Sequence, residues 1–234
     1  MKVFVVQADN RPDHPMVAAT RSLNSRICNI KGWTYRFIDI SPHIRDDESP
    51  IMTSWRVKAD VVDELDPDTI VVYLDTDAWI QHTSDLELLM QDLLDNRKDG
   101  AFSREPYLKD HCIANCGSFF ALASPYFKDI LKEFVRRADA NELIHGVYKT
   151  EAWYDMYLFQ EYILKSPERF SIYIPDILNT PQGKVIRHNW MSQFKCSIPQ
   201  EIECIHRFDD TQLVNQVTSL PVDRSSIIDT VPFP

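Results

Sequence analysis

Hydrophobic and polar residues alternate along this chain in blocks typical of strands and helices in turn. Short apolar runs predict strands, and apolar residues spaced three or four apart predict helices. The predicted strands are residues 3–6, 34–38, 70–74, 101–102, 118–123, 170–174 and 184–186, and the predicted helices are residues 16–30, 52–65, 84–94, 125–135 and 152–164. This alternation predicts an α/β fold with a mainly parallel sheet and helices on both faces.

Local signals mark the ends of several predicted helices. Ser84 and Glu87 have the spacing of a capping box. Ser124 followed by Pro125 is a typical helix start, because proline fits the first turn. Gly32 predicts the end of the helix before it.

Length and composition are those of one globular domain. The chain has 234 residues, of which 44% are hydrophobic and 26% charged. It shows no internal repeat and no linker rich enough to divide it. We expect one domain over residues 1–195 and a C-terminal extension, residues 196–234, that wraps the same domain.

Charge and hydropathy exclude some partners and locations. A net charge of −10 argues against nucleic acid or an anionic membrane as the main partner. No stretch approaches the roughly 18 apolar residues of a membrane helix, so we expect no membrane insertion. Five cysteines without an export signal suggest free thiols in a reducing compartment, and we expect a cytoplasmic protein.

Two acidic residues follow the predicted strand 70–74. Asp75 and Asp77 are separated by Thr76, and alternate residues of an extended segment point to the same side. Sheets of α/β proteins place ligands at the carboxyl ends of their strands. Converging carboxylates repel each other, and a divalent cation compensates this because it takes oxygen ligands from both protein and substrate phosphates. The pair predicts a metal–diphosphate site, with an ordinary Asx turn as the alternative.

Lys58 lies within the apolar stripe of the predicted helix 52–65, between Val62 and Leu65 on the helical wheel. A lysine in such a stripe needs an anion or must extend to solvent. The helix runs antiparallel to the next strand, so Lys58 should lie near that strand's carboxyl end. We expect Lys58 to contact a donor's phosphates or nucleotide; an ion pair or a solvated lysine is the alternative.

Four residues downstream are further candidates for the site, with an ordinary turn and a structural carboxylate as the alternatives. Asn115 and Gly117 lead into a predicted strand, where glycine permits close approach of a ligand to the backbone. Asp155 and Gln160 interrupt the predicted helix 152–164, which is apolar nearly all round and is therefore predicted to be buried. Polar groups in such a helix need partners or line a site.

A histidine is the candidate third metal ligand, because imidazole binds divalent metals. His188 follows the predicted strand 184–186, and His206 is the competing residue. We expect His188 to be the ligand, while His206, or no histidine at all, remains open at this point.

Together these motifs resemble the GT-A-fold, nucleotide-sugar-dependent glycosyltransferases. The resemblance covers roughly residues 3–195 and is nearest the retaining glycogenin-like enzymes and the galactosyl- and xylosyltransferases. In those families a Trp/Lys helix precedes a D-x-D strand, as Trp55 and Lys58 precede residues 75–77. An N-x-G turn follows, as residues 115–119 do here.

One family motif is matched only in part. The families carry a D-Q-x-x-L helix, whereas Phe159 precedes Gln160 in this chain, and Asp155 stands one helical turn earlier. The small size resembles that of bacterial enzymes or of enzymes from large viruses that infect algae. A viral enzyme would lie in the cytoplasm of the host cell.

The resemblance implies transfer of a sugar from a UDP-sugar donor to a glycan, glycoprotein or other hydroxyl acceptor. The nearest families imply retention of configuration, with front-face attack assisted by the leaving phosphate; an inverting enzyme would instead need a carboxylate base such as Asp155 to activate the acceptor hydroxyl group. It implies Mn²⁺ or Mg²⁺ held by Asp75, Asp77 and His188. The implied donor-binding residues are Gln7, Ala8, Asp9, Lys58, Asp75, Thr76, Asp77, Asn115, Gly117 and Lys195, and the implied catalytic residues are Asp155 and Gln160.

Two other classes of function remain as alternatives. Phosphatases of the haloacid-dehalogenase type also carry a D-x-D after an apolar strand, although that strand normally opens their core domain and here lies mid-chain. A non-catalytic sugar-nucleotide-binding protein would keep the same fold. Hydrolysis of a generic aryl phosphate would favour the phosphatase, and metal-dependent hydrolysis of the donor would count against the binding protein.

Overall fold

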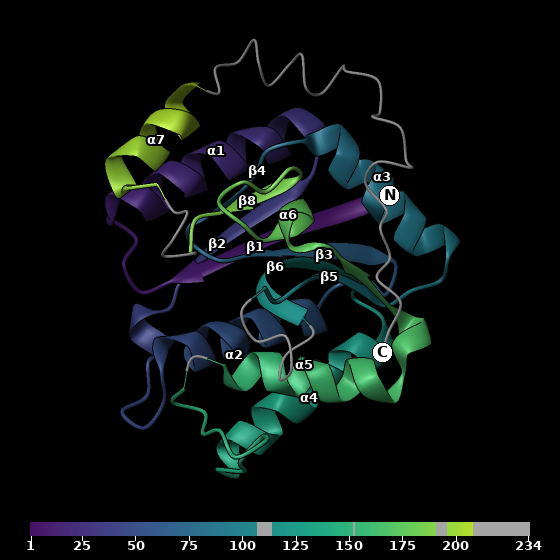
Figure 1. Ribbon diagram of the computed structural model, residues 1–234. Coiled ribbons are helices and arrows are strands. Elements are labelled where there is room, and N and C mark those ends of the chain that lie inside the picture. The colour runs from purple at the N-terminus through teal and green to yellow at the C-terminus, as the bar shows by residue number, and fades with distance from the viewer. Residues whose placement is uncertain (107–113, 152, 191–195, 208–234) are drawn as a thin grey trace.

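A central sheet covered by helices on both faces forms the protein (Figure 1). The computed structural model describes residues 1–106, 114–151, 153–190 and 196–207. The six strands of the sheet lie in the order β2-β1-β3-β6-β5-β7. They are β2 Thr34–Asp39, β1 Lys2–Asp9, β3 Thr69–Leu74, β6 Ala114–Leu122, β5 Gly100–Arg104 and β7 Phe170–Tyr173. Only β6 runs antiparallel to its neighbours, so the predicted α/β fold with a mainly parallel sheet is confirmed.

The helices divide between the two faces of the sheet. One face packs against α2 Pro50–Asp63, α4 Pro125–Asp139 and α5 Tyr154–Lys165. The other packs against α1 Pro15–Lys31, α3 Thr83–Asp95, the short α6 Pro175–Leu178 and α7 Ile198–Arg207. The chain also forms two short 3₁₀ turns, η1 Ser41–His43 and η2 Pro167–Arg169.

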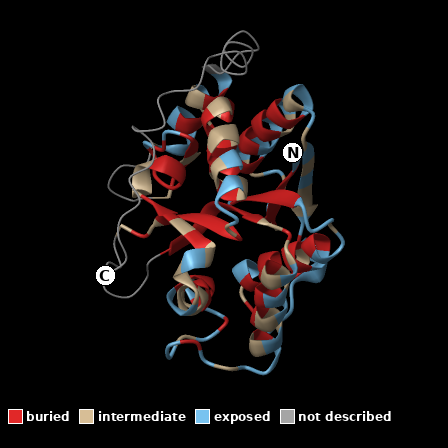
Figure 2. Ribbon diagram, turned by 90° about the vertical axis from the view of Figure 1, so that its right-hand side faces the viewer, coloured by how far each residue is buried: buried red, intermediate tan, exposed pale blue. Residues whose placement is uncertain are grey.

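Strand β3 lies at the centre of the core, and every one of its residues is buried. The strands in the middle of the sheet are drawn mainly in red, the colour of buried residues, in Figure 2. Val71 and Tyr73 face the helices α2, α4 and α5, whereas Ile70 and Val72 face the other layer. A strand with helices on both faces has no polar side, which explains its continuous apolar sequence. The run ends at Leu74, where the chain leaves the sheet.

A second, two-stranded sheet lies beside the carboxyl end of β3. It pairs β4 Ala78–Ile80 with β8 Ile186–His188 in antiparallel register. The predicted strand 184–186 therefore lies two residues later than expected. Glu201 of α7 accepts hydrogen bonds from Trp79 of β4 and Arg187 of β8, so α7 is anchored to this small sheet. The rest of the expected C-terminal extension, residues 208–234, lies outside the described residues.

Two local predictions were wrong. The capping box at Ser84 and Glu87 does not start α3, because the helix begins at Thr83 after His82, without a side-chain cap. Helix α5 is buried only on one face, with Leu164 more than half exposed. The predicted stop at Gly32 is confirmed, because that residue adopts a left-handed conformation with φ of 68°.

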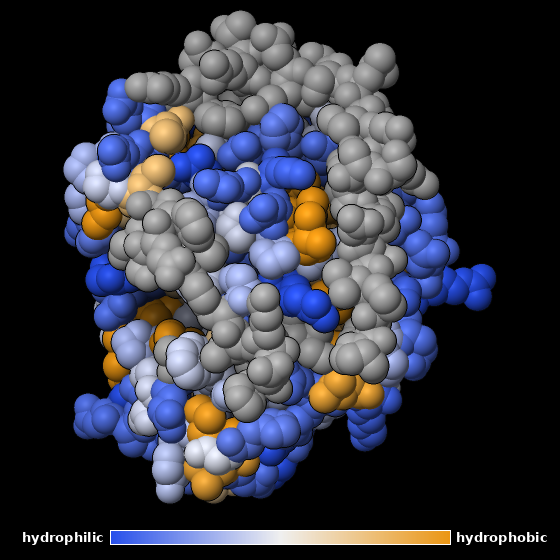
Figure 3. Space-filling model, viewed as in Figure 1, coloured by the Kyte–Doolittle hydropathy of each residue, from blue (hydrophilic) through white to orange (hydrophobic). Residues whose placement is uncertain are grey.

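The described helices and surface can be compared with what a membrane-spanning segment requires. No described helix is long and apolar enough to cross a bilayer. The face shown in Figure 3 is mainly hydrophilic, with its hydrophobic residues in small separate groups. The cysteines within the described ranges are free thiols: Cys28, Cys116, Cys196 and Cys204.

Candidate active site

The acid pair lies in a tight turn directly after β3. The main-chain N–H of Asp75 donates to the carbonyl of Gly117 on the neighbouring β6 (2.7 Å), and that of Ala78 donates back to the carbonyl of Asp75 (3.0 Å). Thr20 of α1 donates to the carbonyl of Thr76 at 2.6 Å. These bonds hold the turn from both sides, so the two carboxylates are placed by fixed backbone.

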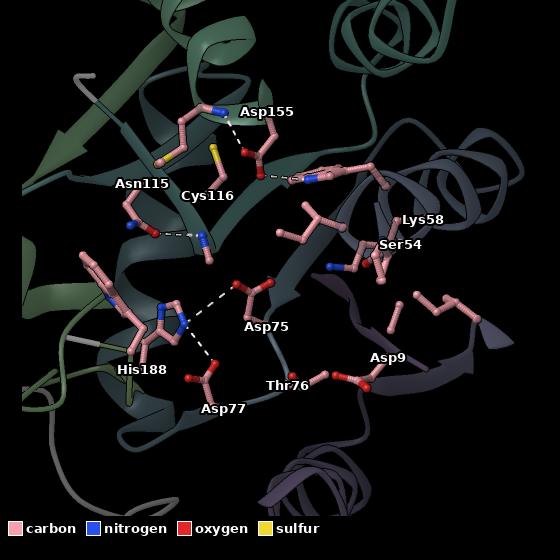
Figure 4. Close-up of a pocket in the computed structure, with 18 of the residues that line it drawn as sticks. Asp9, Ser54, Lys58, Asp75, Thr76, Asp77, Asn115, Cys116, Asp155 and His188 are labelled. Atoms are coloured by element: carbon pink, nitrogen blue, oxygen red, sulfur yellow. Dashed lines mark hydrogen bonds and ion pairs between the residues drawn. The ribbon is translucent and has the colours of Figure 1, made fainter. Parts of the chain in front are cut away.

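His188 is brought to the acid pair by the register of the small sheet. β8 pairs His188 with Ala78, the first residue after the turn. The ring nitrogen Nε2 lies 3.1 Å from Asp77 Oδ1 and 3.8 Å from Asp75 Oδ2. Figure 4 shows the imidazole and both carboxylates pointing toward one another. The expectation that these three side chains converge therefore agrees with the geometry, whereas His206 lies on the exposed side of α7.

The three side chains fit a divalent cation. One ligand atom from each lies within 4.8 Å of the other two, a spacing that an ion between them can bridge. Two carboxylates and an imidazole suit Mn²⁺ or Mg²⁺, which prefer oxygen and accept nitrogen ligands. Gly117 supplies the space: a Cβ there would lie 2.1 Å from Cε1 of His188 and 3.0 Å from Oδ2 of Asp75.

Burial and neighbouring charges shift the pKa values of Asp75, Asp77 and His188. Burial raises the pKa of Asp75, although the charges of Lys58 and His188 oppose it. Burial also acts to raise the pKa of Asp77, but the charge of His188 and its hydrogen bond outweigh burial and leave that pKa lowered. The pKa of His188 is raised, because Asp77 overcomes the opposing effect of burial. Asp77 and His188 therefore each favour the charged form of the other, at a separation of 3.1 Å.

Lys58 faces the acid pair from α2 (Figure 4). It is 3% exposed, and it makes no hydrogen bond or ion pair with any described residue. Its nearest defined partner is the ring of Trp55, with Nζ 5.4 Å from the centroid. Burial lowers the pKa of Lys58, against the attraction of Asp75 and Asp155. A buried ammonium group with no acidic partner in contact among the described residues is well placed to bind an anionic ligand.

Asp155 forms the far wall of the site, at the start of α5. Its two oxygens accept hydrogen bonds from Nε1 of Trp55 and from the main chain of Met156, both at 2.8 Å. Burial raises the pKa of Asp155 to about 6, although the bond from Trp55 opposes the rise. Trp55 thus links α2 to α5 and fixes the orientation of this carboxylate.

One cavity of about 720 Å³ joins these groups, within the size range of roughly 300–1,000 Å³ typical of ligand sites. The predicted site residues that line it are Ala8, Asp9, Lys58, Asp75, Thr76, Asp77, Asn115, Gly117, Asp155 and His188. Because β1 and β3 are adjacent and parallel, Asp9 and Asp75 meet at the same edge of the sheet.

Two predicted residues lie outside the cavity lining. Gln7 is buried behind the site, where Nε2 donates to the carbonyl of Asp75 at 2.8 Å, so it supports the turn and does not line the cavity. Gln160 lies on α5 and does not line the cavity either. Lys195 is outside the described residues.

Several cavity residues were not found from the sequence. They are Arg11, Ser54, Trp153, Met156 and Trp190. Arg11 forms a bidentate pair with Asp9, a spacing of two residues that could have revealed it. Glu105 accepts a 2.6 Å hydrogen bond from Asn115, whose own oxygen accepts from the main chain of Gly117. Both ends of the Asn115 side chain are thus engaged within the protein.

Comparison with solved structures identifies the fold. A glycosyltransferase involved in the glycosylation of the major capsid of PBCV-1 superposes with a TM-score of 0.67 at 13% identity, covering 88% of this chain and all of that one. The galactosyltransferase LgtC, in complex with donor and acceptor sugar analogs, superposes with a TM-score of 0.53 at 12% identity, covering 94% and 98%. No protein-family model and no curated protein sequence matches the chain. The fold is therefore that of the GT-A glycosyltransferases, as the resemblance implied.

Proposed function

We propose that the protein transfers a sugar from a nucleoside-diphosphate sugar, UDP-linked, to a hydroxyl group of a glycan or glycoprotein acceptor, with the help of Mn²⁺ or Mg²⁺. One observation carries the proposal: Asp75, Asp77 and His188 converge in the cavity that also receives the ammonium group of Lys58. That ammonium group has no hydrogen-bond or ion-pair partner among the described residues, although Asp75 and Asp155 attract it. A metal–diphosphate complex is the ligand that uses an acid cluster and a free cation together.

The metal and the lysine have complementary parts. Asp75, Asp77 and His188 would hold the ion, which supplies Lewis-acid stabilisation of the diphosphate leaving group. Lys58, on α2, approaches the diphosphate from another side of the cavity and would add positive charge to the diphosphate oxygens. The protein's net charge of −10 makes this local positive charge necessary for binding a dianionic donor.

The nucleoside end of the donor is assigned to the carboxyl end of β1. Ala8, Asp9 and Arg11 line the cavity there, and the pairing of Arg11 with Asp9 fixes both side chains. In doubly wound sheets an acidic residue near this edge binds ribose hydroxyl groups. Asp9 is placed to accept such hydrogen bonds, and its pKa is lowered by Arg11 against the effect of burial.

Asp155, Glu105 and Asn115 surround the space for the transferred sugar. In the proposed transfer the bond from the anomeric carbon to the diphosphate oxygen breaks, and a bond from that carbon to the acceptor oxygen forms on the same face. The acceptor's proton passes to the departing phosphate oxygen. Asp155, held by Trp55, orients a sugar hydroxyl group during this exchange, and Lys58 stabilises the developing charge.

Thermal-shift measurements test the donor assignment. UDP and UDP-sugars with Mn²⁺ should raise the melting temperature, because a ligand that binds only the folded state stabilises it by about 2.7 kcal/mol at a hundredfold excess over Kd. EDTA should reduce the shift, and GDP- and dTDP-sugars should give smaller ones. The donor assignment fails if no nucleotide shifts the melting temperature at millimolar concentration.

Turnover assays separate the remaining classes. Mn²⁺-dependent release of UDP from a UDP-sugar supports the transferase and excludes a binding protein without catalysis. Hydrolysis of an aryl phosphate at a comparable rate would instead support a phosphatase.

A further inference from the structure

Asn179 holds the ring of the candidate metal ligand His188 from behind. It follows α6, is fully buried, and does not line the cavity. Its Oδ1 lies 2.7 Å from Nδ1 of His188, on the opposite side of the ring from the carboxylates. The other ring nitrogen, Nε2, faces Asp77.

This contact determines which ring nitrogen carries the hydrogen. An amide oxygen only accepts hydrogen bonds, so Nδ1 of His188 is the donor in this pair. A neutral imidazole with its hydrogen on Nδ1 keeps a lone pair on Nε2. Nε2 is the atom that lies among the oxygens of Asp75 and Asp77, where a cation would bind.

The backbone around Asn179 is fixed. Its N–H donates to Pro175 at 3.1 Å, and its carbonyl accepts from Nε1 of Trp190 at 2.7 Å. Trp190 lines the cavity beside His188, with ring centroids 6.1 Å apart. Asn179 therefore supports two cavity residues, His188 through its side chain and Trp190 through its main chain.

The orientation of the Asn179 amide group leaves one of its hydrogen-bond donors unsatisfied. Its nitrogen Nδ2 has no hydrogen-bond partner within the part of the chain that the structure describes. A buried donor without a partner is unfavourable. Turning the amide over would let Nδ2 donate to Nδ1 of His188, but the ring hydrogen would then move to Nε2 and block it as a ligand.

We propose that Asn179 is a positioning residue that selects the Nδ1–H tautomer of His188 and thereby makes Nε2 a metal ligand. The inference rests on the metal site of the proposed function. Metal-binding histidines generally donate their second N–H to such an acceptor, and loss of that acceptor costs roughly 10–100-fold in metal affinity.

Titration with Mn²⁺, following the EPR signal of the free ion at fixed pH, tests the proposal without any assay of activity. Asn179→Leu should weaken Mn²⁺ binding roughly 10–100-fold. Asn179→Asp should retain it, because a carboxylate accepts the same hydrogen bond. Thr180→Val is the matched control: it removes the bond from Thr180 to Asp176 in the same turn without touching the imidazole, and should bind as the wild type does.

A double-mutant cycle shows whether Asn179 acts through His188. In a His188→Asp background the metal ligand at position 188 is a carboxylate, which has no ring hydrogen for Asn179 to place. Adding Asn179→Leu to that background should therefore cause no further loss of Mn²⁺ affinity. A loss that persists in that background, or an equal loss in Thr180→Val, overturns the proposal. Failure of the wild type to bind Mn²⁺ would instead overturn the metal site itself, and this inference with it.

One measurement needs no variant, in case Asn179→Leu does not fold. Long-range ¹H–¹⁵N NMR of the wild type with labelled histidine and saturating Mg²⁺ should place the hydrogen of His188 on Nδ1. A hydrogen on Nε2 would overturn the proposal.

Discussion

The imidazole of His188 occupies the space that a side chain at Gly117 would need. A Cβ on Gly117 would lie 2.1 Å from Cε1 and 2.7 Å from Nδ1 of the ring. The two residues come from β6 and β8, which belong to different sheets. The glycine thus lets the small sheet approach the main one closely enough for His188 to reach Asp75 and Asp77.

Gly117→Ala should therefore displace His188 and weaken Mn²⁺ binding at least tenfold, as loss of one ligand orientation does. Titration calorimetry with Mn²⁺ measures the effect. Gly100→Ala is the matched control in the same sheet, because its Cβ would press on the rings of Phe102 and Phe170, away from the cavity. It should lower the melting temperature and leave Mn²⁺ affinity unchanged. Equal affinities for the two variants would contradict the steric role of Gly117.

Asp77→Ala should abolish metal-dependent donor turnover while the protein remains folded. The metal-free melting temperature should fall slightly, because Asp77 pairs with His188 at 3.1 Å. Asp77→Asn keeps one oxygen ligand and should lose less metal affinity than the alanine variant. Circular dichroism melting and Mn²⁺ titration on both variants measure these effects. An unfolded Asp77→Ala whose soluble fraction still turns over the donor would exclude the metal-site assignment.

Lys58→Met should weaken UDP binding at least tenfold without lowering the melting temperature of the free protein. The ammonium group is buried without a paired anion, so its removal relieves a desolvation cost. Lys149→Met is the control, because Lys149 is also buried but pairs with Asp47 at 2.7 Å outside the cavity. That variant should lose stability and keep UDP affinity. Unchanged UDP affinity in Lys58→Met would remove the lysine from the donor site.

Asp155 should make stability depend on pH between about 4 and 6. Its pKa is about 6 in the folded protein, raised by burial, against about 3.9 for an exposed aspartate. The folded state holds the proton in this range and the unfolded state does not, so stability falls as pH rises, by up to about 3 kcal/mol. Asp155→Asn should lack this decline. Urea unfolding at pH 4, 5, 6 and 7 measures both proteins, and parallel curves would contradict the raised pKa.

Much of the fold could be predicted from local sequence. The apolar run 70–74 and its abrupt end at Asp75 predicted a buried central strand with a ligand site at its carboxyl end, because burial on both faces leaves no polar position. Helical spacing likewise placed Lys58 on the inner side of its helix. The D-x-D segment predicted two converging carboxylates, since alternate residues of an extended chain share a side.

The partners of those residues depended on contacts between distant segments. The sequence alone left either His188 or His206 as the candidate third metal ligand. Only the register of β8 on β4 brought His188 to the acid pair. Gln7 was expected to bind the donor. In the fold, β1 lies beside β3, and the side chain of Gln7 donates to the main chain of Asp75 instead. The sequence around Asn179 gave no indication of its role. That role depends on contact with the imidazole of His188, nine residues later, which the tertiary fold brings beside it.

The sequence by itself thus determined the strands, the helices and the chemical type of the site, because these depend on periodicity and on residue type over a few positions. Only the tertiary structure decided which histidine completes the cluster and which residues orient it. Those choices depend on strand register and on the close approach that Gly117 allows, and neither is encoded in any short segment.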